Sequence, residues 1–328
     1  MVASPITLEA RRRLSRIGLA YCLFFVISFV LQFILAILLM LLTPDFSNST
    51  LATWLLSMVP MYLFAFPVYW LLIRRIPAER PATMRLHTRD FFVFFLISYA
   101  LMYATNLISV LINTLTDLIL GSSSTAGATE IIEASPLYLV VIFAVIIGPI
   151  VEEIMFRGLL LPRLSVFGER FAIAVSALLF ALFHGNLAQF FYAFALGLVF
   201  GFVYSKTGRL RYPILLHMLI NFCGSVLPLL VFELSDIETL ESAAASGSLT
   251  AEQSLAHLPG ILLFFGYFIF ILLACIIGAV LLFRYSRRIT LTPARDPIPK
   301  GERRIVWLSV GGVLILLTTL AALALSYL

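Results

Sequence analysis

The chain has 328 residues, of which 62% are hydrophobic and 12% are charged, and its mean hydropathy is +1.06. Soluble domains contain about 45–50% apolar residues, so this composition excludes a water-soluble fold. The net charge of +5 comes from arginines placed between apolar runs. We therefore expect a lipid bilayer, and no nucleic acid, as the partner of the chain.

Nine apolar runs approach or exceed the roughly 20 residues that a helix needs to cross a bilayer. The fifth and sixth are short and are joined only by Gly185 and Asn186, which predicts a tight helical hairpin. The fold class expected is an all-α, polytopic transmembrane bundle of about nine spans. The runs are 17–42, 51–73, 91–115, 136–161, 171–184, 187–204, 212–232, 260–283 and 305–328.

The connections between the runs alternate in charge. Arginines precede the first run, and Lys or Arg residues occupy every second connection after it, whereas the connections between them carry no Lys or Arg. Because cytoplasmic connections hold the excess of Lys and Arg, this pattern predicts a cytoplasmic N-terminus. We expect a multi-pass protein of the plasma membrane.

Ionisable side chains within apolar runs are costly and are functional candidates by default. Here they cluster in the fourth, fifth and seventh runs, together with one asparagine. The cluster consists of Glu152, Glu153, Arg157, His184, His217 and Asn221.

Two adjacent glutamates begin this cluster. Glu153 and Arg157 are four residues apart and share one helix face, so they are expected to form an ion pair. Glu152 points about 100° away from Glu153 on a helix. It is then free to face a cavity and act as a general base on water.

His217 and Asn221 also share a helix face. A neutral His and an Asn amide directed at one point could stabilise the oxyanion that forms when water attacks a peptide carbonyl. Alternatively, Glu152, His184 and His217 could hold a divalent metal such as zinc, since two His and one Glu form a known catalytic set. The HExxH helix that would make zinc a strong prediction is absent from the sequence.

Three short patterns occur in a fixed order in this region. Glu152, Glu153 and Arg157 resemble the EExxxR motif of the CAAX-protease and bacteriocin-processing family, a family of intramembrane proteases. Phe180 with His184 resembles its FxxxH motif, and His217 with Asn221 resembles its HxxxN motif. The resemblance covers roughly residues 136–230.

The resemblance implies an intramembrane endopeptidase. Glu152 would activate water, His184 would position the water or a metal, and His217 with Asn221 would hold the oxyanion. Members include metalloproteases and glutamate proteases, and their substrates include prenylated CAAX-box proteins and bacteriocin precursors. Rival readings are a binding or immunity protein without catalysis and, less favoured, a transporter that uses buried charges.

Three parts of the chain are expected on this reading. Residues 1–135 hold the first three spans, residues 136–230 hold a CAAX-protease-like catalytic core, and residues 231–328 hold an extracytoplasmic loop and the last two spans. On straight helices Glu152 and His184 would lie toward opposite sides of the bilayer. We therefore predict that the hairpin of the fifth and sixth runs stops inside the membrane and lines a water-filled cavity on the cytoplasmic side.

Overall fold

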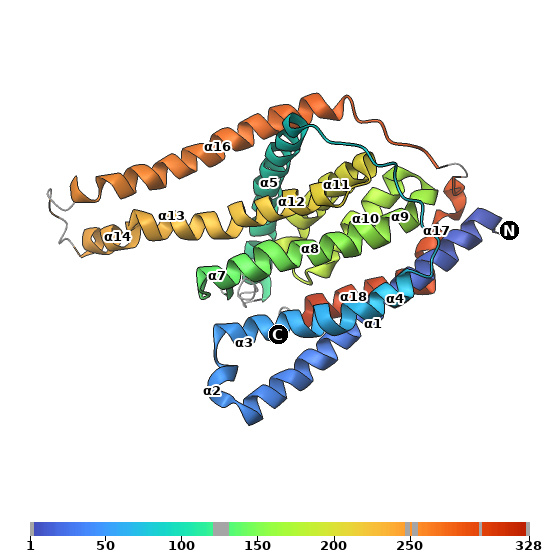
Figure 1. The fold of residues 1–328 in the computed structure, drawn as a ribbon, viewed down its shortest axis with the longest axis horizontal. Coiled ribbons are helices and arrows are strands. Elements are labelled where there is room, and N and C mark those ends of the chain that lie inside the picture. Colours follow the sequence, from blue (N-terminus) through green and yellow to red (C-terminus); the bar gives the residue numbers. More distant parts are fainter. Residues whose placement is uncertain (1–2, 121–130, 247–249, 251–254, 295–296, 326–328) are drawn as a thin grey trace.

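The computed structural model describes residues 3–120, 131–246, 250, 255–294 and 297–325. The elements in these ranges are all helical, as predicted, and they form an elongated bundle (Figure 1). Seven helices are long and apolar enough to cross a membrane, and a bent pair at the C-terminal end raises the number to eight. The chain is therefore a multi-pass helical membrane protein.

The N-terminal third of the chain supplies three of these spans. The first is α1, and the second combines three consecutive helical segments, α3, η1 and α4. The elements are α1 (Pro5–Leu42), α2 (Pro44–Ser47), α3 (Thr50–Met58), η1 (Val59–Ala65), α4 (Phe66–Ile73) and α5 (Thr88–Leu120).

The central third holds the predicted core. A fourth span runs continuously through six short segments, and it is followed by the predicted hairpin and by a span that is again subdivided. The segments are α7 (Leu137–Val140), η2 (Val141–Ile147), α8 (Gly148–Glu153), η3 (Ile154–Leu160), α9 (Leu161–Leu164), η4 (Ser165–Phe167), α10 (Glu169–Phe183), α11 (Leu187–Thr207), α12 (Arg211–Asn221), η5 (Phe222–Val226) and α13 (Leu227–Ser235).

The C-terminal third adds the remaining helices. In Figure 1, α16 lies along the upper side of the bundle and packs against α5, whereas α18 lies against α1 on the lower side. The elements are α14 (Ile237–Ala245), α16 (Leu258–Ser286), η6 (Lys300–Glu302), α17 (Arg303–Trp307) and α18 (Val310–Leu325).

The prediction of nine spans differs from the seven or eight that the described residues contain. The difference arises at the fifth run, which forms α10, a helix of 15 residues. At about 1.5 Å per residue α10 is roughly 22 Å long, shorter than the hydrocarbon core of about 30 Å. The hairpin between α10 and α11 is present where the sequence predicted it.

Four turns of π-helix interrupt the spans of the described chain. Each ends two residues before a proline, and the intervening residue donates its N–H to the carbonyl five residues earlier. Proline has no N–H and its ring clashes with a carbonyl in the preceding turn, so the helix widens there. The pairs are η1 before Pro67, η2 before Pro149, η3 before Pro162 and η5 before Pro228.

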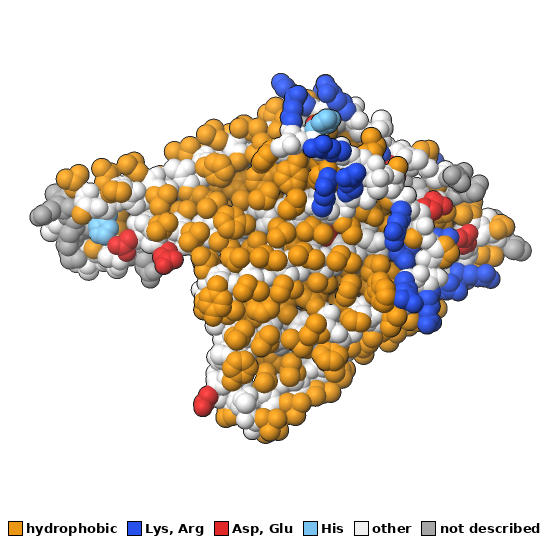
Figure 2. All heavy atoms as spheres, viewed as in Figure 1, with side chains coloured by type: hydrophobic (Ala, Val, Ile, Leu, Met, Phe, Trp, Pro, Cys, Tyr) orange, Lys and Arg blue, Asp and Glu red, His pale blue; other side chains and the backbone are white. Residues whose placement is uncertain are grey.

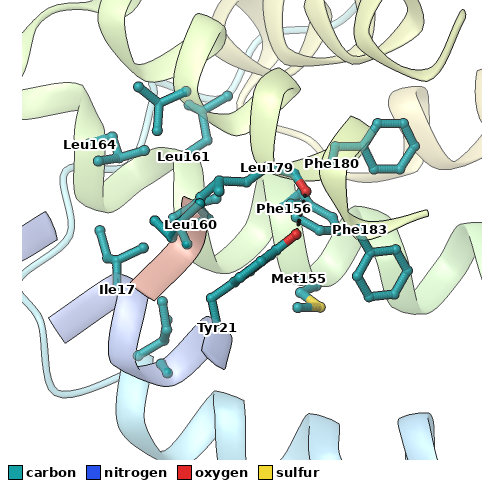
Figure 3. Close-up of a cluster of buried hydrophobic side chains, with 14 of the residues drawn as sticks. Ile17, Tyr21, Met155, Phe156, Leu160, Leu161, Leu164, Leu179, Phe180 and Phe183 are labelled. Atoms are coloured by element: carbon teal, nitrogen blue, oxygen red, sulfur yellow. Dashed lines mark hydrogen bonds between the residues drawn. The ribbon is translucent and has the colours of Figure 1, made fainter. Parts of the chain in front are cut away.

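The core joins the N-terminal spans to the central part. Figure 3 shows Ile17 and Tyr21 of α1 facing Met155, Phe156 and neighbouring apolar side chains. The Tyr21 hydroxyl donates a hydrogen bond of 3.2 Å to the carbonyl of Leu179, drawn as a dashed line in Figure 3. The first span therefore packs directly on the segments that carry the predicted catalytic residues.

Glycines allow α10 and α11 to approach closely. A Cβ built on Gly197 would lie 2.9 Å from Cα and Cβ of Ala177, and one on Gly201 would lie 3.2 Å from Cγ2 of Ile173. Small residues at such positions let helix backbones pack together in membranes.

The outer surface matches a lipid environment. Figure 2 shows hydrophobic side chains covering the face of the bundle, with Lys and Arg gathered toward the side where α1 begins and α16 ends. In the same view, the opposite end near α2 and α14 carries acidic side chains. The cytoplasmic position of the N-terminus stays a prediction, because the charge pattern is the same observation that suggested it.

Candidate active site

The predicted ion pair between Glu153 and Arg157 is present and fully buried. Arg157 Nη1 lies 2.8 Å from Glu153 Oε1, and both side chains are 0% exposed. Arg157 also donates a hydrogen bond of 3.2 Å to the carbonyl of Gly197, and its guanidinium lies 4.4 Å from the ring centre of Phe180. These contacts hold α8 and η3 against α10 and α11, and they keep the Glu153 carboxylate charge compensated.

His217 reaches the same carboxylate from α12. Its Nδ1 lies 3.0 Å from Glu153 Oε1, so one oxygen of Glu153 serves both Arg157 and His217. An ionised carboxylate can only accept hydrogen bonds, and therefore Nδ1 of His217 carries the proton of this contact. The other ring nitrogen, Nε2, is turned toward Glu152 and lies 3.8 Å from its Oε2.

Glu152 is held between two groups on different helices. Its Oε1 accepts a hydrogen bond of 3.1 Å from the Tyr62 hydroxyl, and its Oε2 faces His217. The side chain of Glu152 keeps 13% of its surface exposed, whereas Glu153 keeps none. The two adjacent glutamates thus differ: Glu153 is enclosed in the predicted ion pair, and Glu152 is partly exposed. The cavity that Glu152 was expected to face stays a prediction.

His184 lies at the turn of the hairpin. Its Nδ1 bonds to the carbonyl of Phe180 at 2.9 Å, and Gly185 follows in the left-handed conformation with φ of 67°. Asn186 then caps α11: its Oδ1 accepts from the N–H of Gln189 at 2.9 Å, and its Nδ2 donates to the carbonyl of His184 at 2.8 Å. Glycine suits the left-handed position and asparagine suits the cap, so the local sequence fixes where His184 lies.

Phe180 separates the two histidines. Its ring centre lies 5.1 Å from that of His184 and 5.6 Å from that of His217. Phe180 also lies under the Arg157 guanidinium, and His217 lies beside both glutamates. These contacts join the EExxxR and FxxxH patterns to His217 of the HxxxN pattern.

The short hairpin explains how Glu152 and His184 come to the same level, although straight spans would place them toward opposite sides of the bilayer. The chain runs from Glu152 to the end of α9, turns, and returns along α10 to His184. Each stretch covers roughly 20 Å at about 1.5 Å per residue, so the return path brings His184 back to the level of Glu152. The short hairpin agrees with the prediction, whereas its end inside the membrane and the water-filled cavity beside it stay predictions.

Asn221 has a partner that the sequence did not suggest. Its Nδ2 donates a hydrogen bond of 2.8 Å to the carbonyl of Ala144. In the wide turn η2 the N–H of Gly148 donates to the carbonyl of Phe143, five residues earlier. By the same spacing the carbonyl of Ala144 would accept from the N–H of residue 149, but this residue is Pro149, which has no N–H. Asn221 therefore supplies the donor that Pro149 lacks. Its amide retains a second N–H for other use.

A three-ligand metal site is not formed by these residues. Among the residues that the structure describes, no three His, Cys, Asp or Glu side chains converge so that they could hold a metal ion. Glu152 and His217 approach each other, but together with His184 they are not grouped closely enough to hold a metal ion. The Nδ1 atoms of both histidines bond to Phe180 and Glu153, so any metal would have to bind at their Nε2 atoms. The predicted set of Glu152, His184 and His217 therefore does not fit a metal in this arrangement.

Sequence reasoning missed two contacts of the site. Tyr62 was overlooked because its span contains no charged residue, although a tyrosine hydroxyl in the middle of an apolar run is a polar group that needs a partner. The bond from His217 to Glu153 was missed because Glu153 already had a partner in Arg157.

The fold and these contacts define the class of this protein as a helical membrane protein with a polar site among its spans. In this site Glu153, Arg157 and His217 form a buried cluster, and the neighbouring Glu152 is partly exposed. Residues 134–223 match the family described as Type II CAAX prenyl endopeptidase, Rce1-like. The resemblance to the CAAX-protease and bacteriocin-processing family is thereby confirmed over this segment.

Two curated proteins are similar to the chain. YdiL of Bacillus subtilis, for which a membrane-peptidase activity is proposed, is 35% identical over 104 residues, which cover 30% of this chain and 41% of that protein. The membrane-embedded CAAX protease MroQ of Staphylococcus aureus is 35% identical over 134 residues, covering 38% of this chain and 52% of that protein. The chain therefore spans about half the length of the relatives it matches. No solved structure matches it.

Proposed function

We propose that this chain is an intramembrane endopeptidase in which Glu152 activates the attacking water. The observation that carries the proposal is the position of the Glu152 carboxylate, which is partly exposed and lies between the Tyr62 hydroxyl and His217 Nε2. The family match of residues 134–223 supports a membrane protease independently of this geometry.

The separation of Glu152 and His217 suits a bridging water. Their facing atoms are 3.8 Å apart, too far for a direct hydrogen bond, and one water can contact both. Because Nδ1 of His184 donates to a carbonyl, its Nε2 in the neutral ring is an acceptor, so His184 would be an alternative to His217 as the second acceptor for this water. Glu152 would take one proton from this water as the oxygen attacks the peptide carbonyl, and would later give it to the leaving amine.

Two side chains are candidates for stabilising the oxyanion. A His217 ring with its one proton on Nδ1 has no donor at Nε2, so the oxyanion role predicted for His217 would need a second proton on that ring. Asn221 is the other candidate, because its amide has a second N–H besides the one bonded to Ala144.

The proposed substrates are membrane-associated peptides or lipidated proteins, of the prenylated CAAX type or the bacteriocin type. Support for this class comes from the description of the matched family and from the name of MroQ as a CAAX protease. Opening of the site toward the cytoplasm follows from the Lys and Arg pattern and belongs to the same proposal.

The test is peptide cleavage by purified protein in lipid. Wild type, Glu152→Gln and the matched control Glu9→Gln, an exposed glutamate of α1, are compared on a prenylated CAAX peptide and an unlipidated transmembrane peptide, with and without a strong chelator. We expect cleavage that Glu152→Gln abolishes and Glu9→Gln preserves. Loss of activity with chelator would identify a metalloprotease and would show that the site rearranges around a metal. Equal activity of Glu152→Gln and wild type would refute the mechanism, and no cleavage by wild type would favour a non-catalytic binding protein.

A further inference from the structure

The Glu152 carboxylate depends on a residue far outside the matched segment. Tyr62 belongs to the second span, whereas the family match begins at residue 134. Its hydroxyl donates to Glu152 Oε1 at 3.1 Å, which leaves Oε2 as the oxygen directed at His217. Fixing one oxygen of a carboxylate fixes the direction of the other, because the group is planar and rigid.

The backbone at Tyr62 is fixed by local sequence. Tyr62 lies within η1, the wide turn that precedes Pro67, and π-helical turns occur frequently at functional sites. The same span is tied to the start of the fourth span at a second point. The Trp54 ring stacks on Phe143 at a centroid distance of 5.5 Å, and its indole N–H donates to Ser135 Oγ at 2.9 Å.

The space beside the contact is kept open by a glycine. A Cβ built on Gly148 would lie 3.5 Å from Glu152 Oε1 and 3.8 Å from the Tyr62 hydroxyl, and it would press on the carbonyl of Phe143 at 3.1 Å. A larger side chain at position 148 would therefore occupy the volume next to both oxygens. Glycine at position 148 therefore lets the Tyr62 hydroxyl and Glu152 Oε1 approach each other without a third side chain between them.

A tyrosine has a chemical advantage over a cation at this position. Glu153 is neutralised by Arg157, and a carboxylate so paired is a weak base. A phenol donates one hydrogen bond without adding positive charge, so it can hold Glu152 in place and leave it able to accept a proton.

We propose that Tyr62 is a positioning residue that aligns Glu152 for attack, and that the second span is part of the active site. This inference rests on the proposed endopeptidase activity. It assigns to the N-terminal region a role in the reaction that the matched segment alone would not provide.

The experiment compares Tyr62→Phe with Tyr69→Phe in the full chain. Tyr69 is a buried tyrosine on the same span that packs against Phe24, away from Glu152. A hydrogen bond to a charged group corresponds to roughly a tenfold to hundredfold change in rate. We expect Tyr62→Phe to lower kcat by that factor with KM changed less than about twofold, and Tyr69→Phe to leave both near wild type. A wild-type kcat in Tyr62→Phe would overturn the inference while leaving the proposed function intact.

A second measurement separates the inference from the proposed function. The Tm shift caused by Tyr62→Phe is measured in the wild type and in Glu152→Ala. A shift present in wild type and absent in Glu152→Ala is expected, because the hydroxyl has lost its acceptor. Equal shifts in both backgrounds would overturn the inference whether or not the protein cleaves peptides. If wild type cleaves no peptide, the proposed function fails, and the coupling still decides whether Tyr62 holds Glu152.

Discussion

Replacing Asn221 with alanine tests whether this side chain supplies the hydrogen bond that Pro149 cannot. The bond from Asn221 Nδ2 to the Ala144 carbonyl is 2.8 Å long and partly buried. Losing it and leaving the carbonyl without a donor costs about 1–2 kcal/mol of unfolding free energy. The better helix propensity of alanine offsets about 0.5 kcal/mol of this loss in unfolding free energy.

A double-mutant cycle with Pro149→Ala removes the propensity contribution. In the Pro149→Ala background the backbone has an N–H again and can satisfy Ala144 without Asn221. We therefore expect Asn221→Ala to cost about 1 kcal/mol less in that background than in the wild type. Unfolding in mixed micelles can be followed by tryptophan fluorescence, since Trp54 stacks on Phe143 one residue before Ala144. An equal loss in both backgrounds would refute the assignment of Asn221 to this carbonyl.

Three further predictions concern the surroundings of Glu152 and Glu153. Gly148→Val should abolish most cleavage while the helical circular dichroism stays unchanged, because the added methyl groups fill the space beside Glu152; a fully active variant would contradict this. Arg157→Met should destabilise the protein by about 3–5 kcal/mol, since it leaves Glu153 charged and buried without a counterion. In a thermal unfolding assay, a Tm close to wild type would argue against an ionised Glu153. Gly197→Val should lower the Tm by forcing α10 and α11 apart at Ala177, whereas the exposed Gly301, with nothing within 4 Å, should accept the same change without effect.

The sequence contains enough to predict the charged part of the site. The spacing of Glu153 and Arg157 predicted their ion pair, and the motifs predicted that Phe180 and His217 lie beside that pair. The convergence of His217 and Asn221 on one point stays a prediction. The hairpin that levels His184 with Glu152 could also be predicted, because straight spans could not join the motifs. These successes share a cause: ionisable groups in an apolar chain have few possible partners.

The contacts made by neutral groups could not be predicted in the same way. Tyr62 contacts Glu152 across 90 residues of sequence, and nothing in its own span indicates the partner. The carbonyl of Ala144 lacks a donor because a wide turn precedes Pro149, and helix periodicity does not show where a helix widens. The number of spans was overestimated because the apolar run that forms α10 was counted as a span. With 15 residues α10 is too short to cross a bilayer.

The wide turns before the prolines determine which way each later residue faces. One additional residue in a turn rotates everything beyond it by about 100° relative to an uninterrupted α-helix. Between η2 and Glu152 there is only one helical turn, so closing η2 to α-helical geometry would direct Glu152 away from Tyr62. The same rotation would carry Glu153 out of reach of His217. Deleting one residue from η2 as it closes would cancel this rotation, because the wide turn holds one residue more than an α-helical turn. The wide turn before Pro149 therefore keeps both glutamates on their faces at the present length of the span.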